Sequence, residues 1–123
     1  MSAVGGPGLT THVLDTAHGR PAAGVRIDLS IVEPDGRTRL LRTVTTNADG
    51  RSDAPLRAAS EMTVACYELV FHVAAYFRAA GVALADPPFY DQVPVRFAIA
   101  EPGSHYHVPL LVSPYGYVTY RGS

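Results

Sequence analysis

Residues 25–45 read VRIDLSIVEPDGRTRLLRTVT, in which two strand-like arms flank a turn. Side chains alternate between the two faces of a strand, so the first arm separates an apolar face from a polar one. The apolar face carries Val25, Ile27, Leu29 and Ile31, and the polar face carries Arg26, Asp28 and Ser30. In the turn at 33–36, Pro34 presets a negative φ and Gly36 accepts a positive one. We therefore predict a half-buried strand at 25–32 that returns through a hairpin at 38–45.

The same spacing of β-branched and aromatic residues recurs along the rest of the chain. Further strands are predicted at residues 9–15, 63–73, 90–100 and 105–112, the third weakened by Pro94. Turn chemistry separates the strands at residues 16–21, 47–50, 101–103 and 113–116, and the last turn joins the arms of a closing hairpin. Residues 74–80 are rich in helix formers and end at Gly81, which predicts one short helix. The pattern favours an all-β sandwich or barrel.

Length and composition limit the class of protein. The chain of 123 residues is long enough for one domain with one hydrophobic core, and we expect that domain to span residues 9–123. A formal net charge of −1 provides no broad basic field, which argues against a nucleic-acid partner. Cys66 is the only cysteine, so no intrachain disulfide is possible, and we expect it to pack as a small buried hydrophobe.

The N-terminal residues 1–8 (MSAVGGPG) lack the charged region and the apolar core of a secretion signal. We interpret them as a short flexible lead. No apolar run approaches the roughly 20 residues that a membrane-spanning helix needs. No Ser-Lys-Leu address follows residue 120. These features predict a cytoplasmic location without a membrane partner.

His105 and His107 lie two residues apart in a predicted strand, so their side chains share one face. They could act as an acid/base pair or as two metal ligands. A metal site would need further ligands, such as His12 or His72, but no Cys pair or His-Glu arrangement supplies the usual pattern. Two ordinary surface histidines are the alternative interpretation.

His12 and Arg51 are further candidates for chemistry. His12 occupies the middle of the first predicted strand, where burial would keep the imidazole neutral and able to accept a proton. Arg51 follows the Asp49–Gly50 turn at a predicted strand start, where a rigid guanidinium could bind a carbonyl or anionic oxygen. The alternatives are a hydrogen-bonded structural histidine and a solvated arginine at a strand edge.

Three carboxylates could also act as acids or bases: Asp15, Asp49 and Asp53. Asp15 and Asp49 sit beside turns, where Asp side chains commonly accept hydrogen bonds from backbone N–H groups. We therefore favour structural roles for these two. No phosphate-binding glycine loop, Gly-x-Ser-x-Gly elbow or reactive-cysteine context is present, so an enzyme built on this chain would activate water directly.

The segment Tyr120–Ser123 directly follows the closing hairpin and carries a phenol, a guanidinium, a glycine and a hydroxyl. Disposable termini usually end in frayed polar residues. We therefore expect this segment to be docked and functional.

Several separated motifs together resemble the 5-hydroxyisourate hydrolases, the transthyretin-related enzyme family. They are residues 9–16 (LTTHVLDT) with 19–22 (GRPA), residues 46–51 (TNADGR), residues 105–111 (HYHVPLL) and residues 120–123 (YRGS). The resemblance extends from about Leu9 to Ser123. It implies a transthyretin-like two-sheet β-sandwich of eight strands with one short helix, assembled as a homotetramer.

The resemblance also implies an activity and a set of site residues. The family hydrolyses 5-hydroxyisourate to 2-oxo-4-hydroxy-4-carboxy-5-ureidoimidazoline in urate degradation, and it requires no metal or cofactor. The matching positions make His12, Arg51, His107 and Ser123 the expected catalytic residues. Substrate binding would involve His12 and Arg51 together with Tyr120, Arg121 and Gly122. His105 stays outside this set, because a bulge at Pro109 could turn it away from His107.

Two other functions compete with hydrolysis. Transthyretin shares the family's fold but carries thyroid hormone, so a channel between subunits could bind a hydrophobic ligand without chemistry. His12, Arg51 and His107 argue against this, because they would place unmatched polar groups in an apolar channel. A plain interaction domain of immunoglobulin-like shape would not require these residues to converge at all.

Overall fold

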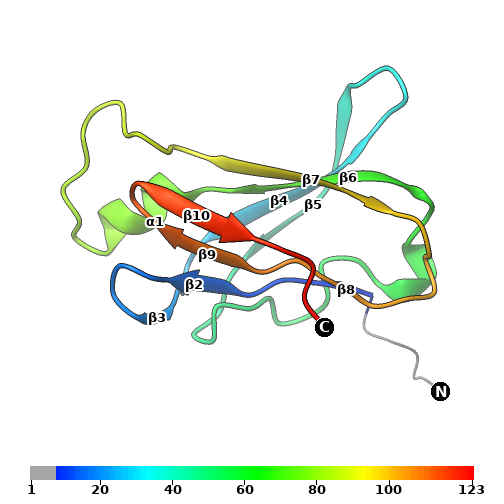
Figure 1. Cartoon of the computed structure of the whole chain (residues 1–123), viewed down its shortest axis with the longest axis horizontal. Helices are drawn as coiled ribbons and strands as arrows, with labels where there is room; N and C mark the ends of the chain where they lie inside the picture. Colours follow the sequence, from blue (N-terminus) through cyan, green and yellow to red (C-terminus); the bar gives the residue numbers. More distant parts are fainter. Residues whose placement is uncertain (1–7) are drawn as a thin grey trace.

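Two four-stranded sheets packed against each other form the body of the computed structural model, which describes residues 8–123 (Figure 1). One sheet has the order β10-β9-β2-β3 and the other β5-β4-β6-β7. The strands of the first are β2 (Val13–Asp15), β3 (Arg20–Pro21), β9 (Leu110–Ser113) and β10 (Gly116–Thr119). Those of the second are β4 (Arg26–Val32), β5 (Thr38–Thr45), β6 (Ala65–Phe71) and β7 (Val93–Ile99). Residues 1–7 of the expected flexible lead lie outside the described residues.

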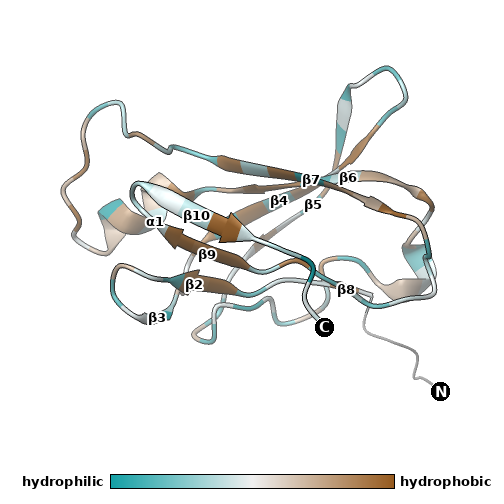
Figure 2. Cartoon of the chain, viewed as in Figure 1, coloured by the Kyte–Doolittle hydropathy of each residue, from teal (hydrophilic) through white to brown (hydrophobic). Residues whose placement is uncertain are grey.

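The hairpin predicted at residues 25–45 is confirmed as β4 and β5. Ile27 and Leu29 are buried in the core, and Arg26 on the opposite face of the strand is exposed, as the alternation predicts. The register shifts between Leu29 and Ser30, which lets Leu41 on β5 also pack against the core. Hydrophobic residues concentrate on β2, β9 and the middle of the other sheet, so the two sheets share one core (Figure 2).

The predicted strands at 9–15 and 105–112 are each divided in two. Besides β2 and β9, they contain β1 (Leu9–Thr10) and β8 (Tyr106–His107), which pair with each other in parallel. Two causes separate the halves. Pro109 has no N–H to donate to a neighbouring strand. The N–H of Val13 donates to Gly50 O at 2.8 Å and not to a neighbouring strand. Counting each divided strand once restores the eight strands of the predicted sandwich.

The predicted short helix is α1 (Val73–Ala79), which buries Val73, Ala74, Tyr76 and Phe77 at one end of the sandwich. It begins one residue earlier than predicted, so the strand before it is shorter: β6 ends at Phe71. Gly81, with φ of +87°, follows the helix as expected. A 3-10 turn, η1 (Ala59–Glu61), was not predicted. No helix within residues 8–123 is long and apolar enough to span a membrane.

Two details of the second sheet bear on the predictions. Pro94 lies in β7, which is an edge strand, and an edge position tolerates the missing N–H. Cys66 is only half-buried, contrary to the prediction of a buried thiol. The alternation in β6 places Tyr67, Leu69 and Phe71 in the core and turns Cys66 to the outer face.

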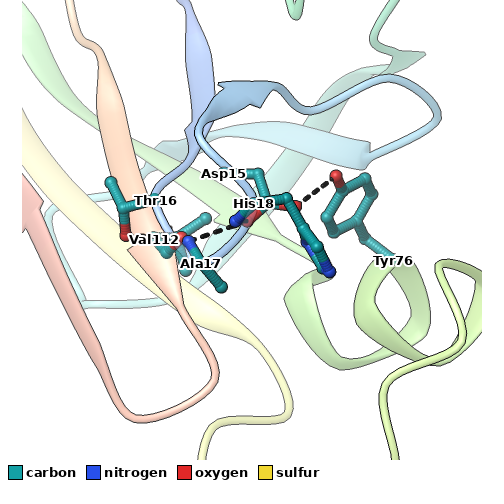
Figure 3. A network of polar contacts seen from close by, with 6 residues as sticks. All are labelled: Asp15, Thr16, Ala17, His18, Tyr76 and Val112. Carbon is teal, nitrogen blue, oxygen red and sulfur yellow. Dashed lines mark hydrogen bonds and ion pairs between the residues drawn. The ribbon is translucent and has the colours of Figure 1, made fainter.

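Asp15 is a buried carboxylate that ties the turn after β2 to the helix (Figure 3). Its Oδ1 accepts hydrogen bonds from the backbone N–H groups of Ala17 (3.0 Å) and His18 (2.9 Å). Its Oδ2 lies 2.6 Å from His18 Nδ1 and accepts a 2.7 Å hydrogen bond from the Tyr76 hydroxyl. Burial alone would raise the pKa of Asp15, but the hydrogen bonds from Tyr76 and His18 outweigh it, so the pKa lies below its ordinary value. The structural role predicted for Asp15 is confirmed.

We predict that Asp15→Ala destabilises the fold by about 3 kcal/mol at pH 7, because it leaves the Tyr76 hydroxyl and two backbone N–H groups without their acceptor. Since folding favours the ionised carboxylate, this contribution is present above about pH 4 and is lost as the pH falls through the lowered pKa. Urea unfolding of wild type and variant at pH 7 and pH 3 measures both effects.

Asp35→Ala is the matched control. Asp35 makes the same kind of bond to the N–H of Arg37 at 3.0 Å, but in an exposed turn. Its loss should cost less than about 1 kcal/mol. Equal losses for the two variants would show that burial and Tyr76 add nothing to the role of Asp15.

Candidate active site

The parallel pairing of β1 with β8 brings the first segment of the chain beside the histidine segment near its other end. Thr10 pairs with His107. The N–H of Val108 donates to Thr10 O at 2.9 Å, and the N–H of Leu110 donates to His12 O at 2.9 Å. Thr11 Oγ1 adds a 2.7 Å bond to Val108 O. These bonds fix the backbones that carry His12 and His107 relative to each other.

His105 and His107 point to the same face despite Pro109. Their ring centroids are 6.1 Å apart, and both rings contact the hydroxyl of Thr10. The interruption at Pro109 falls after His107, so it does not disturb the alternation between the two histidines. His105 therefore belongs with His107, and the sequence argument that kept it apart was wrong about the geometry.

Arg51 is held by the loop that follows Thr46. The side chain of Asn47 accepts hydrogen bonds from the N–H groups of Asp49 (2.9 Å) and Arg51 (3.2 Å), so Asn47 rather than Asp49 caps this turn. Gly50 has φ of +75°, and a Cβ there would lie 2.4 Å from Val13 O. Arg51 lies in a bend and is exposed; no strand begins there in the described chain, contrary to the prediction.

Both candidate bases are neutral at physiological pH. Burial lowers the pKa of His107, and the charges of Arg51, His105 and His12 lower it further. Burial and then Arg51 also lower the pKa of His12, partly offset by the nearby Asp49. Because Arg51 acts on both histidines and His12 acts on His107, the three residues lie within electrostatic reach of one another. A neutral imidazole near a guanidinium can accept a proton while the arginine stabilises negative charge.

The C-terminal segment returns to His107 (Figure 1). The N–H of Gly122 donates to His107 O at 2.7 Å. An added Cβ at Gly122 would lie 2.7 Å from Cδ2 of the His107 ring, so only glycine allows the segment this close to the imidazole. Arg121 stacks 4.1 Å from the centroid of the Tyr106 ring and donates to His105 O at 3.3 Å.

These residues surround one open hollow of about 430 Å³. Its lining includes Thr10, Arg51, Asp53, His105, His107 and Ser123. His12 lies beside the hollow without lining it. Tyr120 and Arg121 line a different hollow, against β7, and neither lines the hollow that contains the histidines.

Thr10 is not among the site residues predicted from the sequence, and His105 is paired with His107 there but placed outside the expected catalytic set. The signal for both was the two-residue alternation, which puts Thr10 on the same side as His12 and His105 on the same side as His107. Asp53 was considered as an acid or base; here its Oδ1 accepts a 2.9 Å hydrogen bond from Asn47. No group of three or more potential metal ligands occurs within residues 8–123. His72 lies at the other sheet, with Nε2 2.8 Å from Asp28 Oδ2, so it cannot complete a metal site with the other histidines.

Fold and site together define a class: a transthyretin-like β-sandwich with a histidine–arginine hollow at one end. The model of the HIUase/Transthyretin family matches residues 9–122. The chain belongs to this family.

Two curated relatives and two solved structures illustrate the similarity. The 5-hydroxyisourate hydrolase 2 of Rhizobium meliloti (strain 1021) is 63% identical over 115 residues, which cover 94% of this chain and 95% of the relative. The 5-hydroxyisourate hydrolase of Deinococcus radiodurans is 56% identical over 119 residues, covering 97% and 98%. Among solved structures, (S)-allantoin synthase superposes with a TM-score of 0.87 at 46% identity, covering 94% of this chain and 43% of that longer chain. Sea bream transthyretin in complex with thyroxine gives 0.81 at 29% identity, covering 93% of both.

We predict that Gly122→Ala displaces the His107 ring or the C-terminal segment, because the new methyl group would meet Cδ2 at 2.7 Å. The imidazole ¹H and ¹⁵N resonances of His107 should shift, with little change in Tm. Gly103→Ala is the matched control, since its Cβ would meet nothing within 4 Å. His107 resonances that are identical in both variants would show that the segment does not press on the ring.

Proposed function

We propose that this protein hydrolyses 5-hydroxyisourate to 2-oxo-4-hydroxy-4-carboxy-5-ureidoimidazoline, a step of urate degradation. The chain is an enzyme of the HIUase/Transthyretin family. Relatives named for this hydrolysis match it at 56–63% identity over nearly their whole length. The single observation that best supports the reaction is that His107, whose pKa lies below its ordinary value, and Arg51 line the same hollow.

In this proposal, His107 is the general base. Its neutral imidazole takes a proton from water as the water oxygen attacks a ring carbonyl carbon of the substrate. The guanidinium of Arg51 binds the carbonyl oxygen and stabilises its developing negative charge. When the amide C–N bond of the six-membered ring breaks, the leaving nitrogen takes the proton from His107. This returns the base to its neutral form and requires no metal or cofactor. His12, which interacts electrostatically with both residues, orients the substrate or assists the proton transfer.

The C-terminal segment has a supporting role in the proposal. Ser123 lines the hollow and offers its hydroxyl to the water or the substrate. Gly122 allows the segment to approach His107. Tyr120 and Arg121 are proposed to bind substrate, although their side chains face another hollow within one chain. A second subunit would have to bring them to the substrate.

We expect purified protein to accelerate the ultraviolet absorbance decay of freshly generated 5-hydroxyisourate in chelator-treated buffer. His107→Ala should lower turnover about 10²- to 10⁴-fold, the usual contribution of a general base. Because the base must be neutral, the wild-type rate should fall on the acid side only below about pH 6.5, as the lowered pKa of His107 requires.

His72→Ala is the control for this test, because it removes a histidine at the other sheet. Its turnover should equal that of the wild type. Full turnover in folded His107→Ala would remove His107 from the mechanism. No acceleration by folded wild-type protein would instead favour a ligand carrier, as in the thyroxine complex of sea bream transthyretin.

We also propose a homotetramer in the cytoplasm. The two sheets end in the edge strands β3, β5, β7 and β10, and an edge strand can pair with another chain. Large apolar side chains are exposed on and beside β10, with Val118 59% and Tyr120 55% exposed. We predict a mass near four times 13.1 kDa by analytical ultracentrifugation. Val118→Asp should lower it, whereas Val64→Asp, at a site 71% exposed in the loop before β6, should not. A wild-type monomer would contradict the assembly.

A further inference from the structure

The hydroxyl of Thr10 contacts two histidines at once, and the mechanism above makes no use of it. Thr10 Oγ1 lies 2.8 Å from Nδ1 of His107 and 2.9 Å from Nε2 of His105. Both are good hydrogen-bond distances. The backbone of Thr10 is fixed by β1, because its carbonyl accepts the N–H of Val108 at 2.9 Å. The hydroxyl is therefore held between the two rings.

One hydroxyl has a single proton to donate, whereas each neutral imidazole has one donor and one acceptor nitrogen. Thr10 can donate to one ring and accept from the other, which gives two arrangements; in a third, its two lone pairs accept from both rings and its proton points away from them. In the first, it donates to Nε2 of His105 and accepts from the Nδ1–H of His107. In the second, it donates to Nδ1 of His107 and accepts from the Nε2–H of His105. In the first two arrangements, the protonation of one histidine determines the tautomer of the other.

The third arrangement would leave the Thr10 proton without an acceptor within residues 8–123. Of the other two, only the first makes His107 a base at Nε2. Its Nε2 then carries a free lone pair, and this atom has no hydrogen-bond partner within residues 8–123, while the ring lines the hollow. When Nε2 takes a proton, the Nδ1–H bond to Thr10 stays in place, so no group has to rotate. In the second arrangement Nε2 already carries the proton and cannot accept another.

We propose that Thr10 is a positioning residue that holds His107 in the tautomer protonated on Nδ1, and that His105 selects this tautomer by accepting the hydroxyl proton of Thr10. The proposal rests on the hydrolysis proposed above and deepens it. Arg51, His12 and Asp53 also surround His107 or its hollow, and Asp49 and Arg121 lie close by. These charged and titratable groups influence how readily the ring is protonated, but none is hydrogen-bonded to Nδ1 of His107 in the described chain.

The test replaces Thr10 and reads the tautomer directly. In wild-type protein above pH 8, imidazole ¹⁵N shifts should show His107 protonated on Nδ1. Thr10→Ser keeps the hydroxyl and should keep this tautomer, with kcat within about 3-fold of wild type. Thr10→Val removes the hydroxyl at nearly constant shape. It should mix the tautomers, move the acid limb of the pH profile, and lower kcat about 10- to 100-fold with little change in KM. This loss is smaller than the roughly 10⁴-fold loss of kcat caused by a fully wrong histidine tautomer in a serine protease.

Three further variants separate the positioning role of Thr10 from a general effect on stability. Thr16→Val removes another threonine hydroxyl, bonded to Val112 O at 3.1 Å, and should leave kcat unchanged. His105→Gln keeps an acceptor for the Thr10 hydroxyl, whereas His105→Phe does not. We expect His105→Phe to behave like Thr10→Val and His105→Gln to stay closer to wild type.

Two results would overturn the positioning role while leaving hydrolysis intact. One is a wild-type His107 protonated on Nε2 in an active enzyme, a measurement that does not depend on any variant folding. The other is unchanged tautomer and kcat in folded Thr10→Val. An inactive wild type with His107 protonated on Nδ1 would instead support the positioning role of Thr10 and reject the proposed reaction.

Discussion

The parallel pairing of β1 with β8 is the constraint on which the site depends. It joins Thr10 to His107 across nearly the whole length of the chain, through bonds such as that from Val108 N to Thr10 O at 2.9 Å. Pairing strands so distant in sequence carries a loop-closure cost, which the shared core of the two sheets offsets. Once the pair has formed, the histidine side chains can converge only on one face.

Irregular backbone then opens room beside this pair. Pro109 ends the ladder after His107, and the loop carrying Arg51 enters where Val13 bonds to Gly50 instead of to a strand. Glycine is required where chains approach most closely: at Gly50 against Val13 O and at Gly122 against the His107 ring. A sandwich with uninterrupted strands would close this end with regular hydrogen bonds and leave no hollow.

The same family includes a transthyretin solved in complex with thyroxine and proteins named as 5-hydroxyisourate hydrolases, so the sandwich alone does not decide function. The site in this chain is polar: partial burial and the positive charge of Arg51 lower the pKa values of its imidazoles. The two effects act in the same direction, since burial and a neighbouring cation both disfavour the imidazolium. An apolar ligand would leave these groups unpaired, whereas water and a carbonyl oxygen would satisfy them.

The sequence by itself determined the local features: the alternation of the 25–45 hairpin, the short helix after β6, the turn at Asp15, and the histidines and arginine as the chemically capable residues. Each follows from the preferences of neighbouring residues. Only the tertiary structure decided which of them meet. It placed Thr10 between His105 and His107, moved Arg51 from a strand start into a bend, and turned Cys66 outward. These outcomes depend on contacts between segments far apart in the chain, about which periodicity and turn chemistry carry no information.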